Sequence, residues 1–217
     1  MAKIETKEII LNFEAKEYLQ DFIEHLSDVL KHAEFFLTYR SGKIRVKVVG
    51  ERDVIADSVS LIKMHSKIFL HSVLPNNEGF YSHHISFLQK YASSIVTIDF
   101  IVSALKYSGY ESYYRDSEIH TKATLDIVGE TSEHLYELIQ EITDIKGKLI
   151  REIILTVSHC KNTSPSFVLK KGIELKLFNE YKGKIIVTTP AEVSIPKLLE
   201  EISSSEGIVD KETVEDF

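Results

Sequence analysis

The first 75 residues combine strand and helix patterns in an order that few folds share. Short β-rich runs and amphipathic runs, whose apolar residues recur three and four positions apart, follow one another as strand, helix, strand, strand and helix. These segments are residues 8–13, 15–30, 35–40, 44–49 and 53–70. Ser41 and Gly42 join the middle strands in a tight hairpin, because glycine tolerates a positive φ. The order is that of a split βαβ unit, which predicts an α+β fold with helix-covered antiparallel sheets.

The second strand of the predicted hairpin has two chemically different faces. Ile44, Val46 and Val48 lie on one face because side chains alternate along a strand. Arg45 and Lys47 point the other way. This alternation fits a strand of the helix-covered antiparallel sheet that the order of the elements predicts.

Turn-forming residues separate this part from the next. The run Leu74-Pro75-Asn76-Asn77-Glu78-Gly79 interrupts every periodic pattern. Beyond it, the patterns predict helices over 84–91 and 98–107, strands over 110–115 and 119–128, and a helix over 132–142. Gly109 is the expected stop of the helix before it.

A short sequence echo links the two parts. Val-Gly-Glu occurs at residues 49–51 and again at 128–130, each time at the end of a predicted strand that leads into an amphipathic helix. Residues 184–189, with the apolar periodicity that follows them, are a third version. The echo indicates either duplicated strand–helix units or convergence on a common turn.

The next segment allows more than one interpretation. Residues 145–157 fit both a helix and a strand, because their apolar positions satisfy both periods. Ser164 and Pro165 form a helix start, with the serine as cap and the proline in the first turn. Residues 177–187 contain a basic hairpin. Two helices followed by a basic hairpin resemble a winged helix.

The closing helix has two candidate starts. Thr189 fits a capping box, but Pro196 would then interrupt the helix, so Ser194 is the alternative cap. The chain is thus expected to form three modules and a tail. The modules are residues 1–75, 80–145 and 146–204, and the acidic tail is residues 205–217.

Composition excludes several classes of protein. The 217 residues are 43% hydrophobic and 27% charged, as in ordinary globular domains, and the net charge is −7. Cys160 is the single cysteine, which excludes a disulfide within the chain and favours a reducing compartment. The N-terminal residues lack a secretory signal, and the most apolar stretch, residues 92–105, is too short to cross a bilayer. We therefore expect a cytoplasmic protein with no membrane partner.

Basic residues are concentrated near the C-terminus. Residues 146–184 hold nine lysines and arginines against three acids, a local charge of +6 that leaves −13 for the rest of the chain. A local field of this kind influences binding more than the overall charge does. The cations expected to contact phosphate are Lys146, Lys148, Arg151, Lys170, Lys171, Lys176, Lys182 and Lys184. The alternative is a solvated basic face that balances acidic surface elsewhere.

An aromatic cluster offers a second nucleic-acid signal. Tyr113 and Tyr114 could stack nucleobases while Arg115 contacts phosphate, as in single-strand binding proteins. Because the two tyrosines alternate along a strand, the competing explanation is that at least one belongs to the core.

Motifs for catalysis and for metal binding are absent from the sequence. It has no glycine-rich phosphate loop, no H-E-x-x-H, no C-x-x-C and no G-x-S-x-G. His159 and Cys160 are sequence neighbours whose side chains diverge, so they make a poor base–nucleophile pair. We therefore expect no catalytic residues, no metal site and no cofactor.

Two stretches resemble a known family. Residues 104–130, ALKYSGYESYYRDSEIHTKATLDIVGE, and residues 48–63, VVGERDVIADSVSLIK, are similar to an archaeal family described only as a domain of unknown function. The resemblance implies an archaeal cytoplasmic protein and supplies no catalytic or ligand-binding residues. The first module also resembles ferredoxin-like and KH-like RNA-binding architectures. It departs from them because it lacks a G-x-x-G loop, and residues 42–49 lack the aromatics of an RNA-recognition strand.

These features lead to a ranked set of functional hypotheses. The first is a non-enzymatic RNA- or ribosome-associated binding protein that uses its basic C-terminal face. The second is a protein–protein interaction or assembly module, which includes a homodimer, with no nucleic-acid role. The third is a small-molecule enzyme without a recognisable motif, which would need a concave pocket with converging acids or histidines.

Overall fold

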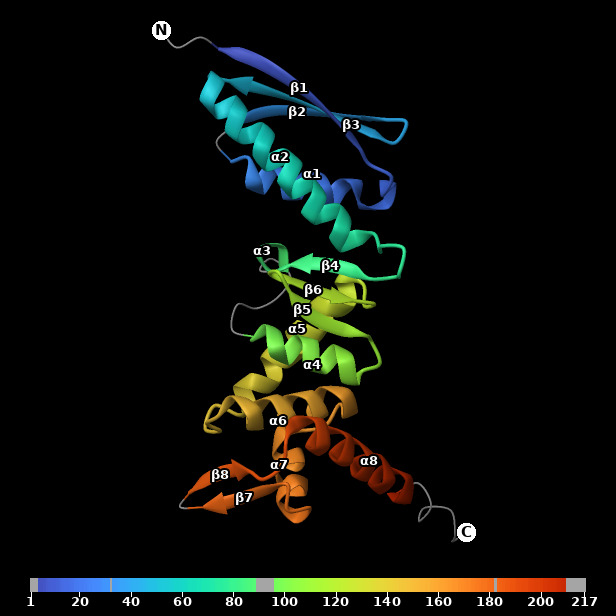
Figure 1. The fold of residues 1–217 in the computed structure, drawn as a ribbon, viewed down its shortest axis with the longest axis vertical. Helices are drawn as coiled ribbons and strands as arrows, with labels where there is room; N and C mark the ends of the chain where they lie inside the picture. Colours follow the sequence, from blue (N-terminus) through green and yellow to red (C-terminus); the bar gives the residue numbers. More distant parts are fainter. Residues whose placement is uncertain (1–3, 32, 89–95, 182, 210–217) are drawn as a thin grey trace, which may run out of the picture. The chain divides into compact units, whose positions relative to one another are not determined.

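The computed structural model describes residues 4–31, 33–88, 96–181 and 183–209, with side chains through Ser204 (Figure 1). Helices and small antiparallel sheets make up these parts, which confirms the predicted α+β class. The chain divides into two compact units, Met1–Phe87 and Leu88–Phe217.

The first unit is a split βαβ fold, as predicted. Its elements are β1 (Glu5–Asn12), η1 (Lys16–Tyr18), α1 (Leu19–Val29), β2 (Glu34–Arg40), β3 (Lys43–Gly50), α2 (Arg52–Val73) and β4 (Tyr81–His84). In the sheet, β3 lies between β1 and β2 and is antiparallel to both. The two outer strands therefore run parallel, and α1 is the crossover between them.

The turn between β2 and β3 fixes the register of the sheet. Ser41 and Gly42 both adopt left-handed backbone conformations, with φ of 51° and 73°. This is the geometry of the two-residue hairpin turn whose twist matches that of its flanking strands. The turn places Arg40 opposite Lys43, and the pairing continues to Glu34 opposite Val49.

One face of this sheet is buried beneath α1 and α2 (Figure 1). Ile44, Val46 and Val48 on β3 have no exposed surface, as their alternation predicted. Phe22 from α1 and Phe69 from α2 complete the core, with ring centroids 5.2 Å apart in an edge-to-face arrangement. Among the described residues of this unit, no helix covers the other face of the sheet.

The predicted helix over 84–91 differs from the structure. Residues 81–84 form β4, a short helix α3 spans Ile85–Leu88, and residues 89–91 lie outside the described part of the chain. The reason is local: the Asn76 side chain accepts hydrogen bonds from the backbone N–H groups of Glu78 and Phe80, both at 2.9 Å. This turn leads the chain back along α2 in an extended conformation.

The second unit begins with a helix and a hairpin. Helix α4 (Ile98–Tyr107) has the predicted bounds and ends before Gly109, whose φ is +97°. Strands β5 (Ser112–Arg115) and β6 (Glu118–Thr121) pair antiparallel. The predicted strand over 119–128 was therefore too long.

Helix α5 (Leu125–Glu141) starts seven residues earlier than predicted. The Thr121 hydroxyl accepts the Ala123 N–H at 3.1 Å and turns the chain out of the strand. Gly129 consequently lies inside a helix, whereas Gly50 ends β3. The interpretation of Val-Gly-Glu as a repeated strand end was wrong for its second copy.

The ambiguous segment over 145–157 is helical from Lys148 onward. Helix α6 (Lys148–Lys161) ends at Asn162, which is left-handed with a φ of 46°, and α7 (Pro165–Glu174) follows. The Ser164 hydroxyl caps α7 by accepting the Phe167 N–H at 3.4 Å, as predicted. Strands β7 (Phe178–Tyr181) and β8 (Lys184–Val187) form the expected hairpin. This is the element order of a winged helix.

The closing helix α8 spans Ala191–Val209 and contains Pro196. Ser194 is not its cap, because it is buried in the first turn and its hydroxyl donates to the Thr189 carbonyl at 3.2 Å. Pro196 lies inside the helix, where it lacks the N–H that would donate to the carbonyl of Glu192 four residues earlier.

A continuous core joins the elements of the second unit. Its buried apolar residues run from Leu88 to Ile202, and Ile153, Ile154 and Leu155 on α6 have no exposed surface. The segments that the sequence divides at residue 145 share this core. Among the described residues, no helix has the length and apolar character to span a membrane.

Candidate nucleic-acid interface

The exposed face of the first sheet carries an ordered set of cations. On β3, Lys43, Arg45 and Lys47 are exposed while the residues between them are buried. Their spacing of two residues places them about 7 Å apart along the strand. Arg40 at the end of β2 extends the set, because it lies opposite Lys43 in the register. Four cations thus share one surface, which we call the open sheet face.

The register defines which residues of the outer strands belong to the open sheet face. Each row across the sheet joins one residue from β1, one from the central strand β3 and one from β2. The rows are Thr6–Val49–Glu34, Glu8–Lys47–Phe36, Ile10–Arg45–Thr38 and Asn12–Lys43–Arg40. Two apolar side chains stand among these polar residues: Phe36 is 54% exposed and Ile10 is 55% exposed.

The charge of this face differs from that of its unit. The first unit has eleven lysines and arginines against twelve acids, a net charge of −1. The open sheet face has four cations against two acids, Glu8 and Glu34. Arg45 pairs with Glu8 at 3.3 Å, and both side chains are about half exposed. Surface pairs of this kind are weak, so an incoming anion can compete for the arginine.

Three cations of the open sheet face can bind an incoming anion without first breaking an ion pair to a described carboxylate. In the described part of the chain, no ion pair joins Arg40, Lys43 or Lys47 to a carboxylate. The aromatic and aliphatic side chains beside these three cations are uncharged and therefore do not neutralise them. The face therefore offers a local positive field in a unit that is close to neutral overall.

The predicted C-terminal cations are distributed over several elements of the second unit. Lys146 is exposed before α6, and Lys148 in the first turn of α6 pairs with Asp99 on α4. The pKa of Lys148 is raised because Asp99 accepts its hydrogen bond and adds a negative charge nearby. Arg151 is partly buried on α6, where its Nε has no hydrogen-bond partner among the described residues. These three do not form an open basic face.

The remaining predicted cations lie on α7 and the hairpin that follows it. Lys171 pairs with Glu174 at 3.4 Å, whereas Lys170, Lys176 and Lys184 are exposed. Thr188 donates to the Lys176 carbonyl at 2.8 Å and so ties the end of α7 to the base of the hairpin. Lys182 lies outside the described residues. This group is smaller than the eight cations that the sequence proposed.

The aromatic cluster is exposed rather than core. Tyr113 and Tyr114 point to opposite faces of β5, and they are 47% and 44% exposed. The Tyr113 ring stacks on His120 with centroids 4.9 Å apart. Arg115 pairs with its neighbour Asp116 at 3.0 Å. The competing explanation, that at least one tyrosine belongs to the core, was wrong, because β5 is an edge strand and both rings are accessible.

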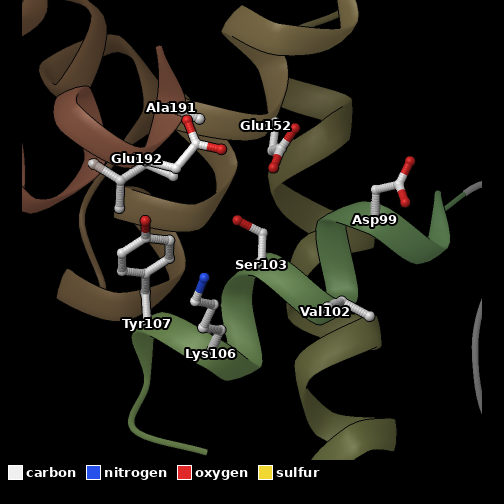
Figure 2. A pocket seen from close by; sticks show the side chains of 9 residues that line it. Asp99, Val102, Ser103, Lys106, Tyr107, Glu152, Ala191 and Glu192 are labelled. Atoms are coloured by element: carbon white, nitrogen blue, oxygen red, sulfur yellow. The ribbon is translucent and has the colours of Figure 1, made fainter. Parts of the chain in front are cut away.

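A separate pocket of about 250 Å³ opens between α4, α6 and α8 (Figure 2). Ser103 and Tyr107 on α4 face Glu152 on α6 and Glu192 on α8 across it. Asp99 lines its edge. The volume is below the usual range for pockets that hold substrates or drug-sized ligands.

Hydrogen bonds in this pocket hold its helices together. Thr156 on α6 donates to the Ser103 hydroxyl at 3.1 Å, and both residues are buried. Burial raises the pKa of Glu152, an effect that a hydrogen bond from Ser103 opposes. The pKa of Tyr107 is raised by burial and then by the charges of Glu192 and Glu152. We attribute this network to helix packing, because both hydrogen-bond partners of the Ser103 hydroxyl, Thr156 and Glu152, lie on α6 and join that helix to α4.

The histidines and the cysteine do not form a metal site in the described residues. His134 on α5 and His159 on α6 bring their Nδ1 atoms to 3.0 Å. Burial and the neighbouring His134 lower the pKa of His159 to about 4. Burial raises the pKa of the Cys160 thiol, so the thiol is a weaker nucleophile than an ordinary cysteine.

The sequence placed two cations of the open sheet face on the polar side of a strand. It did not indicate that this face would be the leading candidate for the binding site. Arg45 and Lys47 were assigned to the polar face of a strand, and the structure confirms their exposure. Phe36 was missed because β2 carries aromatic residues on both faces, Phe35 and Tyr39 toward the helices and Phe36 away from them. The available signal was the spacing of Phe36, because it falls on the same strand face as the polar residues Glu34, Thr38 and Arg40.

Comparison with known proteins gives the family of this chain. A family model described as "Uncharacterized protein conserved in archaea (DUF2067)" matches residues 11–193. No curated protein and no solved structure matches the chain. The matched residues include the sheet of the first unit from the end of β1 and the second unit as far as the start of α8. This chain therefore belongs to the archaeal DUF2067 family, as the resemblance of residues 48–63 and 104–130 predicted.

Proposed function

We propose that this protein is a non-enzymatic RNA-binding protein and that the open sheet face is its principal contact surface. The observation that carries the proposal is the alignment of Lys43, Arg45 and Lys47 on the central strand, with Arg40 beside them. Phosphate groups supply most of the affinity in protein–nucleic acid complexes, and they bind exposed lysines and arginines of this kind.

The architecture of the first unit supports this choice. A sheet whose helices cover one side offers its other side as a flat platform for a polymer. The open sheet face combines cations with polar side chains and Phe36, which is the composition of surfaces that bind nucleic acid. The pocket in the second unit is a weaker candidate, because its carboxylates would repel RNA and its volume suits only a very small ligand.

The C-terminal cations are assigned a secondary role. Lys170, Lys176 and Lys184 are exposed on α7, after α7 and on β8. They would add phosphate contacts in the manner of a winged helix, whose second helix and hairpin approach the same nucleic acid. Association with a ribosome is the setting in which two basic surfaces on one acidic protein would both be used.

Substitutions that remove positive charges from the open sheet face test the proposal. We expect Arg40→Gln combined with Lys47→Gln to weaken binding of a fluorescent oligoribonucleotide, measured by anisotropy at several salt concentrations. The slope of log K against log salt should fall by about 0.7 for each phosphate that the variant no longer neutralises. The matched control is Lys63→Gln with Lys67→Gln, because both lysines are exposed on α2 and the change in net charge is the same.

A second pair of substitutions distinguishes the open sheet face from the C-terminal cations. Lys170→Gln with Lys176→Gln should reduce binding less than the sheet variant does. Equal reductions in the sheet variant and the α2 control would indicate a general charge effect and contradict the assignment to the open sheet face. If the wild-type protein does not bind the oligoribonucleotide at low salt, the proposal of RNA binding fails.

A protein-interaction role is the second candidate, and one feature favours it. Exposed apolar side chains occur on α7 and on the outer face of the hairpin: Phe167, Ile173, Tyr181 and Ile186. Such residues are common in protein interfaces. Light scattering on the purified protein would detect a homodimer, and the substitution Tyr181→Ser should then increase the monomer fraction. If the protein is monomeric at all concentrations, the homodimer hypothesis is excluded.

A further inference from the structure

We infer that the RNA bound on the open sheet face is single-stranded and that one of its bases stacks on the ring of Phe36. The inference rests on the proposed function and adds the class of ligand and the residue that recognises it. Its basis is the position of one aromatic ring relative to the row of cations on β3.

The side chain of Phe36 does not belong to the core. Its neighbours on the same face of β2 are Glu34 and Thr38, and its own side chain is 54% exposed. A phenylalanine gains about 1.5 to 3 kcal/mol from full burial, a gain that this position forgoes in large part. On this polar strand face the ring is therefore accessible to a ligand that would cover it.

The register places a cation directly beside this ring. Phe36 lies opposite Lys47, and Arg45 is the diagonal neighbour one row further along. Directly opposed side chains have Cβ atoms about 4.5 to 5.5 Å apart. A nucleotide can therefore rest its base on the ring while its phosphate reaches Lys47 or Arg45.

The line of cations indicates the path of the strand. Lys43, Arg45 and Lys47 follow β3, which is the central strand of the sheet. A sugar-phosphate backbone that follows β3 would turn its bases toward the outer strands. Phe36 lies on β2 and Ile10 on β1, so each side offers one exposed apolar side chain.

A single strand fits this surface better than a duplex. In a duplex the faces of the bases are stacked on one another and are not accessible to a flat sheet. In a single strand each base presents a free face, which aromatic side chains bind with little dependence on sequence. A duplex could use the cations of the open sheet face but could not use Phe36.

The test compares substitutions of Phe36 in the full chain, with fluorescent twelve-nucleotide oligouridylate as the single strand and an RNA hairpin stem as the duplex. We expect Phe36→Ala to weaken oligouridylate binding by about tenfold and to leave the salt slope unchanged, because stacking releases no counterions. Phe36→Tyr should retain binding, and Phe36→Leu should behave like Phe36→Ala because leucine has no aromatic face.

Controls keep the test independent of folding and of general surface effects. Phe36 is exposed, so Phe36→Ala should leave the thermal unfolding midpoint nearly unchanged. Met64→Ala is the matched control, because Met64 is a large apolar side chain of the same unit that is 50% exposed on α2, away from the open sheet face. It should leave the binding of oligouridylate unchanged.

The possible outcomes distinguish this inference from the proposed function. If Phe36→Ala binds oligouridylate as tightly as the wild type while Arg40→Gln with Lys47→Gln loses affinity, stacking is excluded and RNA binding by the cations stands. Tighter binding of the hairpin stem than of oligouridylate would also overturn the inference. If neither probe binds the wild type, the proposed function itself fails.

Discussion

Gly172 lies where α7 meets the hairpin, and its missing side chain makes room for a buried ring. A Cβ atom added at this position would lie 2.2 Å from Cδ2 and Cε2 of Phe178, which has no exposed surface. We expect Gly172→Ala to reduce the free energy of unfolding by about 1 to 3 kcal/mol, because the ring must shift in a closely packed core. Urea denaturation would measure this effect.

Helix propensity alone gives the opposite sign for Gly172→Ala. Alanine favours a helix over glycine by about 1 kcal/mol, so a stabilised variant would contradict the packing argument. Combining Gly172→Ala with Phe178→Leu should recover part of the stability, because leucine has a smaller side chain. Lys170→Ala, at an exposed position on the same helix, should change stability by no more than about 0.5 kcal/mol.

Single residues also show how far the sequence could define the candidate site. Alternation along β3 was enough to assign Arg45 and Lys47 to the polar face. The same reasoning could not rank that face above the C-terminal cations, because ion pairs depend on distant residues. Lys148 and Asp99 are 49 positions apart in sequence, yet they pair in the fold. A count of charged residues in the sequence does not reveal which cations are neutralised by ion pairs in the fold.

At the scale of elements, periodicity predicted most helices and failed where two periods overlap. The bounds of α4 were predicted without error, and Gly109 follows the helix as the expected stop. Residues 119–128 carry alternating apolar positions and were assigned to a strand, but burial of Val128 and Leu135 against the core selects a helix from Leu125. The choice depends on tertiary packing, which the local pattern does not contain.

The contact between α5 and α6 makes the second unit sensitive to acid. Burial and His134 lower the pKa of His159 to about 4, against 6.5 for an ordinary histidine. The unfolded chain therefore binds more protons than the folded one between these values, and stability falls as the pH drops from about 6.5 to about 4. Because the side chain is partly exposed, we expect stability to fall by about 1 to 2 kcal/mol.

A His159→Gln variant isolates this effect from the titration of carboxylates. Glutamine can keep a hydrogen bond to His134 but does not titrate. The difference in unfolding free energy between pH 7 and pH 4.5 should be smaller in the variant than in the wild type, as measured by urea denaturation at both pH values. The same pH dependence in both proteins would show that His159 does not contribute.

At the scale of the whole molecule, the cores determine which segments fold together. The sequence places a module boundary at residue 145, where polar residues separate two apolar patterns. Helix α6, which follows this point, nevertheless packs against both α4 and α8 and buries Ile153, Ile154 and Leu155 completely. Apolar periodicity identifies the buried face of a helix but not the elements that cover it, so the sharing of a core across residue 145 could not be predicted.

This shared core makes a prediction about cooperativity. Leu155→Ala should lower the free energy of unfolding by about 2 to 5 kcal/mol, because it leaves a cavity at a fully buried position. In native-state hydrogen exchange, slowly exchanging amides of α4 and α8 should lose protection by the same amount as those of α6. Leu149→Ala, at a position of the same helix that is 43% exposed, is the control and should have a small effect. If α6 and α8 lose protection while α4 and α5 keep theirs, residue 145 separates two independently folding modules, and the continuous core does not unite them.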